Sequence, residues 1–190
     1  HHAGYGLETQ VDLKWIEAEE LEDQDPAGFL QDCHGVLVPG GFGVRGTRGM
    51  IKSIQYAREQ RIPFFGICLG MQMASVEFAR NVVGLEGADS TEFDDAPKHR
   101  VIFKLRELVD VEELGGTMRL GAYPCRLAAG SQGARAYGTT EISERHRHRY
   151  EFNHEYRKAL EDKGLSFTGM SPDGVFVEIV ELKDHPYFLA

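Results

Sequence analysis

Cysteine and long apolar runs are scarce in this sequence. Its 190 residues contain three cysteines, Cys33, Cys68 and Cys125, none of them in a CxxC pair, so the sequence excludes a disulfide framework and a zinc knuckle. No apolar run approaches the roughly 18 residues of a membrane span, and residues 1–20 lack the basic and apolar regions of a signal peptide. We therefore expect a cytoplasmic protein without a membrane partner.

Positive charge is also in short supply. The chain has 21 lysine and arginine residues against 30 aspartate and glutamate residues, which gives a formal net charge of −9. An acidic surface repels nucleic acids and acidic membranes, so these are excluded as main partners and small polar metabolites are favoured. With 42% hydrophobic residues, the chain is long enough to bury the core of one domain.

The order of apolar segments predicts an α/β fold. Through residue 84, apolar segments bounded by glycine or proline alternate with helix-like periodicity, as a parallel sheet requires. After residue 86 the chain becomes loop-rich and acidic, then rich in strand-like segments, which indicates an antiparallel extension of the same domain. The predicted strands lie within residues 11–21, 35–39, 62–67, 115–128, 144–153 and 174–182, and the predicted helices at 50–60, 69–84 and 154–164.

The stretch FFGICLG places Cys68 between two glycines, after a predicted strand and before a predicted helix. This is the form of a nucleophile elbow, in which neighbours without a Cβ atom allow a strained turn and the helix start supplies N–H groups for an oxyanion. The helix N-terminus favours a thiolate by only about 0.3–1 kcal/mol, so efficient attack also needs a histidine base that a carboxylate orients. The alternative interpretation is a packed core thiol.

The stretch GGFGVRG, residues 40–46, contains a GxGxxG pattern at Gly41, Gly43 and Gly46. After a strand, such glycines cradle the pyrophosphate of a dinucleotide, and an acidic residue about 20 positions later binds the ribose. Glu59 has roughly that spacing, but it lies inside a predicted helix and not at a strand end. Because a lone GxGxxG pattern is a weak signal, we disfavour the dinucleotide site. The alternatives are a loop that directs backbone N–H groups at the cysteine turn and a plain strand-to-helix turn.

The run RHRHRY alternates two kinds of basic residue. As a strand it places Arg145, Arg147 and Arg149 on one face and His146 and His148 on the other. We favour a guanidinium that binds a carboxylate, and the alternative is a solvated edge strand. A metal pair would lack a third ligand at useful spacing, and a nucleic-acid patch disagrees with the net charge.

Seven stretches, in the same order along the chain, resemble the class I glutamine amidotransferase domain of the CTP synthase family. They are LVPGGFGVRG, FFGICLGMQ, FARNVVG, ADSTEF, GGTMRLGAYPC, ERHRHRYEFN and VEIVELKDHPYF. The resemblance covers residues 1–190 and implies a flavodoxin-like fold, with a doubly wound, mostly parallel sheet and an antiparallel β extension. It also implies that Cys68 attacks the side-chain amide of L-glutamine, releasing ammonia and leaving a glutamyl thioester that water hydrolyses. In the family the ammonia passes to a synthetase domain, absent from these residues, which uses ATP and Mg²⁺ to convert UTP to CTP.

The resemblance assigns roles to residues of this site. The backbone of Gly41 and Leu69 matches the oxyanion hole. Arg149 can pair with the α-carboxylate of glutamine and Glu92 with its α-ammonium, so that the substrate is held at both charges. The residues implied to bind glutamine are Gly41, Leu69, Gly70, Met71, Gln72, Glu92 and Arg149.

Regulation and assembly are also implied by the resemblance. Phe42, Arg45 and Arg119 fall in regions linked to activation by GTP, and no metal or other cofactor is expected in this domain. The full-length enzymes of the family are homotetramers, whereas an isolated domain is compatible with a monomer. Two other functions stay open: a nucleotide-binding or catalytically silent regulatory domain that uses the glycine loop, and another cysteine amidohydrolase.

Both ends of the sequence depart from the family pattern. The family's catalytic histidine and glutamate lie in a Phe-His-Pro-Glu-Phe motif that follows the strand in which this sequence stops, and the strand before HHAGYGLET is also missing. His185 is not that histidine, because Tyr187 stands where the acid is required, and we interpret His185 as structural. We therefore expect these residues to belong to a longer chain. A chain that truly ended at Ala190 should have very low glutaminase activity, because its thiol lacks a base.

Overall fold

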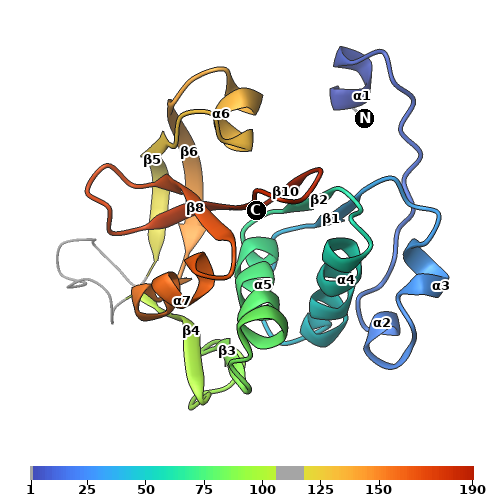
Figure 1. Ribbon diagram of the computed structural model, residues 1–190, viewed down its shortest axis with the longest axis horizontal. Coiled ribbons are helices and arrows are strands. Elements are labelled where there is room, and N and C mark those ends of the chain that lie inside the picture. Colours follow the sequence, from blue (N-terminus) through green and yellow to red (C-terminus); the bar gives the residue numbers. More distant parts are fainter. Residues whose placement is uncertain (1, 106–117) are drawn as a thin grey trace.

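The structure is a computed structural model that describes residues 2–105 and 118–190 (Figure 1). In this part of the chain a seven-stranded main sheet has the order β1-β2-β10-β9-β8-β5-β6, and a three-stranded second sheet has the order β3-β4-β7. The strands are β1 Val36–Val38, β2 Phe64–Gly66, β3 Ala88–Ser90, β4 His99–Lys104, β5 Arg119–Leu127, β6 Glu141–His148, β7 Tyr150–Phe152, β8 Leu165–Met170, β9 Val177–Leu182 and β10 Phe188–Leu189. The helices are α1 His2–Gly6, α2 Glu20–Asp23, α3 Ala27–Leu30, α4 Thr47–Glu59, α5 Leu69–Phe78, α6 Gln132–Tyr137 and α7 Arg157–Glu161, with a π-helical turn at Ala79–Val83 and a 3₁₀ turn at His154–Tyr156.

Three parallel strands carry the helices α4 and α5. β2 pairs in parallel with β1 on one side and with β10 on the other, so that Phe64 lies opposite both Val36 and Phe188. α4 and α5 pack beside each other against these strands (Figure 1). α4 does so through a buried stripe that includes Ile51 and Ile54, whereas α5 is buried on all sides. The core of the domain therefore lies between this helical layer and the parallel strands.

The predicted α/β domain with an antiparallel extension is confirmed, but its parallel part is smaller than the predicted mostly parallel sheet. From β10 onward the main sheet pairs in antiparallel fashion, through β9, β8, β5 and β6. A doubly wound sheet also needs helices on both faces. On the face opposite α4 and α5, Leu37 is 57% exposed and Phe65 is 38% exposed. Where this face continues onto β10 and β9, α6 covers it: Ala134 of α6 lies in one core cluster with Ile179 and Leu189.

Residues 11–21 do not form the predicted strand. They run without a strand partner among the described residues, Trp15 is 88% exposed, and α2 begins at Glu20. An apolar alternation is not sufficient for a strand, because the backbone N–H and C=O groups also need a neighbouring strand to pair with.

The other predicted elements are confirmed with shifted ends. The helix from residue 69 continues through the π-helical turn to Gly84, whose φ of 83° gives it the predicted role as C-cap. The start of the predicted strand at 115–117 lies outside the described residues, and β5 begins at Arg119. The short helix α6 was not predicted, because six residues are too few to show an apolar period. No helix in the described ranges is long and apolar enough to cross a membrane.

Two glycines allow α5 to begin directly against the sheet. A Cβ atom on Gly70 would lie 2.3 Å from the carbonyl oxygen of Val38, and a Cβ atom on Gly66 would lie 2.8 Å from the Cβ atom of Ala190. Both separations are shorter than van der Waals contact, so a larger residue at either position would displace α5 from the strands. The glycines on either side of Cys68 are therefore required by packing.

We expect Gly70→Ala to destabilise the protein by about 3 kcal/mol, because the new methyl group meets a backbone carbonyl that cannot move aside. Gly28→Ala is the matched control. Gly28 also lies in a helix, and a Cβ atom added there would have no neighbouring atom within 4 Å. The Gly28→Ala variant should therefore be more stable than the unchanged protein by up to about 1 kcal/mol. Urea unfolding measures both changes. If Gly70→Ala were as stable as Gly28→Ala, the close packing described for α5 would be contradicted.

Candidate active site

The glycine loop and the cysteine turn lie side by side at the carboxyl ends of β1 and β2. The glycine loop, residues 39–46, follows β1, and the cysteine turn, residues 66–70, follows β2 in parallel register. A Cβ atom on Gly40 would lie 3.3 Å from the Cβ atom of Cys68, so the two segments are in contact. Ligands of α/β proteins commonly bind at this edge of the sheet.

The backbone of Cys68 is strained. Its φ is 56° and its ψ is −103°, a conformation that residues other than glycine rarely adopt, and it immediately precedes α5. The N–H of Ile67 donates to the carbonyl oxygen of Val38 at 2.9 Å, and the N–H of Met71 donates to that of Cys68 at 3.0 Å. The sulfur-bearing side chain is partly exposed. The predicted nucleophile elbow is therefore present, and Cys68 is not a fully buried core thiol.

Burial and backbone hydrogen bonds shift the pKa of the Cys68 thiol in opposite directions. Burial raises its pKa above the ordinary value of 9.0, and the negative charges of Glu151 and Glu92 act in the same direction. Hydrogen bonds from the backbone N–H groups of Leu69 and Gly41 lower it. These are the two residues predicted to form the oxyanion hole, and both donors lie at the sulfur. Because the net shift is upward, the thiol is protonated at neutral pH and needs a base to become a nucleophile.

Glu92 connects the glycine loop to the second sheet. It follows β3, and its Oε1 accepts a hydrogen bond from the N–H of Gly43 at 2.8 Å. The carboxylate thus lies at the loop that contacts Cys68, where it can receive a cationic group of a ligand. Glu59, the acid considered for a dinucleotide site, lies on α4 and accepts a hydrogen bond from Gln55 of the same helix at 2.9 Å. This arrangement does not support the dinucleotide interpretation.

The junction between β6 and β7 forms the other side of the site. Gln72, in the first turn of α5, donates from Nε2 to the carbonyl oxygen of Tyr150 at 3.0 Å. Arg149 lies between the two strands with an exposed side chain that has no hydrogen-bond or ion-pair partner among the described residues. Its guanidinium is therefore available to a ligand carboxylate. The other predicted residues of this turn are Leu69, Gly70 and Met71, all buried.

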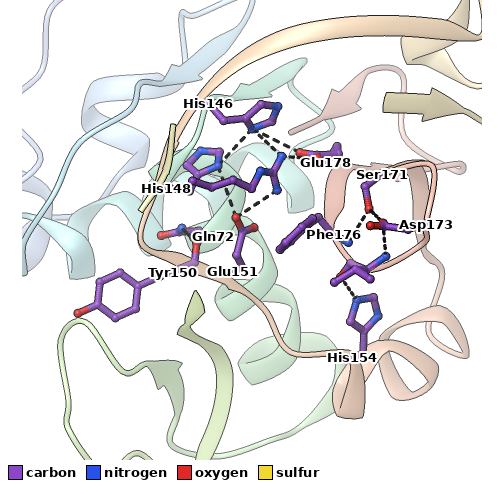
Figure 2. Close-up of polar contacts among 12 residues, drawn as sticks. Gln72, His146, His148, Tyr150, Glu151, His154, Ser171, Asp173, Phe176 and Glu178 are labelled. Atoms are coloured by element: carbon purple, nitrogen blue, oxygen red, sulfur yellow. Dashed lines mark hydrogen bonds and ion pairs between the residues drawn. The ribbon is translucent and has the colours of Figure 1, made fainter. Parts of the chain in front are cut away.

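Arg119 lies in a buried cluster, and Figure 2 labels its other members, among them His146, Glu151 and Glu178. Its Nη1 donates to Glu151 Oε1 at 3.2 Å, its Nη2 donates to Glu178, and the same Nη2 lies 3.0 Å from Nδ1 of His146. His148 completes the cluster, with its Nδ1 3.3 Å from that of His146. The predicted alternation of the RHRHRY run is confirmed, because its histidines face inward and its arginines are exposed.

Burial shifts the pKa values of several side chains in this cluster. Burial lowers the pKa of His146 and of His148 to about 4, with a further contribution from Arg119, so both rings are neutral at physiological pH. Burial raises the pKa of Glu151, whereas the charge of Arg119 and its hydrogen bond to this carboxylate lower it. In the described residues, no group of three or more histidine, cysteine, aspartate or glutamate side chains is arranged to hold a metal ion.

The three residues that the family resemblance links to activation by GTP lie in different environments. Phe42 is 56% exposed, with its ring centroid 5.5 Å from the guanidinium of Arg147, and Arg45 forms an exposed ion pair with Glu19. Arg119 has no exposed surface. Its strand position faces the core and buries the side chain, and paired carboxylates make that burial tolerable.

The described histidines do not supply a base for Cys68. None of their hydrogen bonds goes to the sulfur: His146 and His148 lie in the Arg119 cluster, and His154 bonds to the carbonyl oxygen of Val175. His185 is buried, with Nδ1 3.0 Å from the carbonyl oxygen of Tyr187 and Nε2 3.2 Å from that of Ala57. The interpretation of His185 as structural is confirmed.

Two functional features were missed from the sequence. The carbonyl oxygen of Tyr150 binds Gln72, and Glu151 binds Arg119. A backbone acceptor leaves no signal in side-chain identity. Glu151 follows the basic run directly, and a break in the strand at Arg149 changes the face on which the following residues lie, so the alternation rule does not extend to it.

Comparison with known proteins identifies the family. A profile of the class-I glutamine amidotransferases matches residues 1–190. The chain belongs to this family. CTP synthase of Koribacter versatilis is 62% identical over 192 residues, which are 99% of this chain and 34% of that protein. CTP synthase of Geobacillus kaustophilus is 58% identical over 189 residues, which are 100% of this chain and 36% of that protein.

Comparison with a solved structure supports the same family membership. The glutaminase domain of Trypanosoma brucei CTPS with bound acivicin aligns with a TM-score of 0.91 and 36% sequence identity, covering 100% of this chain and 74% of that chain. The chain spans about a third of the length of the two CTP synthases.

The raised pKa of Cys68 predicts slow alkylation at neutral pH. Only the thiolate reacts, so the rate of iodoacetamide addition to Cys68 should still be rising at pH 9.0. Cys125, whose pKa burial raises to about 11, should react more slowly over the same range and serves as the internal control. Peptide mass spectrometry separates the two sites. A rate at Cys68 that is already maximal at neutral pH would contradict the electrostatics described.

Proposed function

We propose that this chain is the glutaminase domain of a CTP synthase, which hydrolyses L-glutamine through a thioester on Cys68. The observation that carries the proposal is the position of the Cys68 sulfur, at the strained start of α5 and within reach of the N–H groups of Gly41 and Leu69. A thiol with two backbone donors suits attack on a carbonyl carbon, because the donors stabilise the negative charge that develops on the carbonyl oxygen. The similarity to CTP synthases over the whole chain supports this choice of substrate.

An amino acid suits the two charged groups at the site. Arg149 offers a guanidinium without a partner in the described residues, which suits an α-carboxylate. Glu92 offers a carboxylate at the glycine loop, which suits an α-ammonium. Between them, the first turn of α5 would receive the side chain of glutamine. Binding at both charges would place the amide carbon at the sulfur.

The proposed reaction has two steps. The thiolate of Cys68 adds to the amide carbon, the C–N bond breaks, and ammonia leaves after the nitrogen takes up the proton lost from the thiol. Water then attacks the thioester carbon, the C–S bond breaks, and glutamate and the free thiol are formed. In both steps the oxyanion would lie at the N–H groups of Gly41 and Leu69.

The proton acceptor for Cys68 is proposed to lie in sequence that follows Ala190. β10 runs parallel to β2, with Leu189 opposite Phe65, and a Cβ atom on Gly66 would touch Ala190. A chain continuing in the direction of β10 would therefore emerge beside the cysteine turn. A histidine and a glutamate in that segment, as in the family motif, would complete the catalytic group.

The remaining features belong to the full-length protein. We propose that the ammonia passes to a synthetase domain in the same chain, where ATP and Mg²⁺ support the conversion of UTP to CTP, and that the protein is a cytoplasmic homotetramer. The isolated domain is compatible with a monomer. For activation by GTP, Phe42 and Arg45 are the accessible candidates of the three residues considered. The alternatives, a silent regulatory domain or a different cysteine amidohydrolase, have no comparable support from the relatives.

Acivicin, an electrophilic amino acid, tests the proposed activity in the full-length protein. We expect one equivalent to be incorporated at Cys68, L-glutamine to protect against it, and Cys68→Ala to abolish it, because the thiol is the attacking group. Cys125→Ala should be labelled like the unchanged protein. Intact-mass spectrometry gives the stoichiometry. Absence of labelling together with tight binding of a dinucleotide would instead favour the regulatory alternative.

A further inference from the structure

The proposed reaction does not use the Arg119 cluster, although the cluster contains a fully buried guanidinium. The whole side chain of Arg119 is inaccessible, and its guanidinium lies 4.8 Å from the ring centroid of Tyr123 and 4.3 Å from that of Phe176. Glu151 and Glu178 are its two carboxylate partners. Replacing a buried ion pair by apolar residues is often neutral or stabilising, so stability alone does not explain such a cluster.

Glu151 connects this cluster to the candidate active site. It immediately follows Arg149 and Tyr150 in the chain, and three contacts fix this short segment from different sides. The N–H of Leu105 donates to the carbonyl oxygen of Arg149 at 2.9 Å, Gln72 of α5 donates to that of Tyr150, and Arg119 of β5 holds the carboxylate of Glu151. These contacts fix the backbone of residues 149–151, while the described residues offer the Arg149 side chain no hydrogen-bond or ion-pair partner.

Glu178 occupies a different place in the same cluster. It lies on β9, accepts a hydrogen bond from Arg119, and its Oε2 lies 3.5 Å from Nδ1 of His146. No hydrogen bond or ion pair joins Glu178 to the described residues assigned to glutamine. Glu151 and Glu178, both labelled in Figure 2, thus share a partner and deep burial. Only Glu151 belongs to the chain segment that carries Arg149.

We propose that Arg119 and Glu151 form a positioning pair for substrate binding: through the backbone of residues 149–151 they hold Arg149 and the Tyr150 carbonyl in place against the first turn of α5. The pair touches no substrate itself. The inference rests on the proposed function, because it takes Arg149 as the group that meets the α-carboxylate. Loss of the pair should weaken recognition of the amino-acid end of the substrate and leave the thiol unchanged.

The test compares Glu151→Gln with Glu178→Gln in the full-length protein. Each variant removes one carboxylate from Arg119 and preserves side-chain shape. We expect Glu151→Gln to raise the KM for glutamine roughly tenfold with kcat changed less than about threefold, as for lost substrate positioning. Glu178→Gln should leave both constants close to those of the unchanged protein. Glu151→Asp, which keeps the charge, should recover part of the lost affinity.

A second readout uses two electrophiles on Cys68. Acivicin needs the amino-acid subsite and iodoacetamide does not, so Glu151→Gln should slow acivicin labelling alone. Parallel changes with both reagents, or equal effects in Glu178→Gln, would show a general structural role and overturn the inference. If Glu151→Gln does not fold, Glu151→Asp gives the same comparison with a smaller change. Failure of the unchanged protein to react with acivicin would overturn the proposed function and this inference together; normal labelling with no difference between the variants would overturn the inference alone.

Discussion

Helix α5 begins at Leu69 and packs Gly70 against the carbonyl oxygen of Val38, and the geometry of the site depends on this contact. Because the helix starts so close to β1, the chain must turn sharply after β2, and Cys68 takes a φ of 56°. The turn directs the side chain away from the core and leaves the N–H of Leu69 at the sulfur. The same approach brings the glycine loop into contact with Cys68, which adds the second donor, Gly41. One packing constraint thus produces both the nucleophile position and the oxyanion donors.

The second sheet lies beside the two charged groups that we propose to bind the substrate. Glu92 follows β3 and Arg149 precedes β7, and these strands flank β4 in one small sheet. Hydrogen bonds from Gly43 to Glu92 and from Gln72 to Tyr150 join that sheet to the glycine loop and to α5. In the proposed function, the reactive group therefore comes from the parallel strands of the main sheet, and the groups that bind the substrate charges come from the second sheet.

Sequence reasoning succeeded where a local pattern determines the structure. Glycines on both sides of Cys68, between an apolar strand and a helix, predicted the elbow, and alternation in RHRHRY predicted which side chains face inward. Sequence reasoning failed where the local structure depends on a partner that is distant in the sequence. Residues 11–21 have a strand-like pattern but lack a paired neighbour in the described chain, and Arg119 has no local signal for the two carboxylates, from β7 and β9, that surround it. The resemblance to a known family supplied the roles of Glu92 and Arg149, which spacing alone did not.

The central claim is that Cys68 is the nucleophile toward glutamine, and trapping of the intermediate tests it most directly. The full-length protein would be mixed with glutamine, quenched in acid within one turnover, digested and examined by mass spectrometry. The account predicts one glutamyl group on the peptide that contains Cys68, present during turnover and lost when glutamine is exhausted. Glutamine hydrolysis with no adduct at Cys68, or with the glutamyl group on another residue, would contradict it.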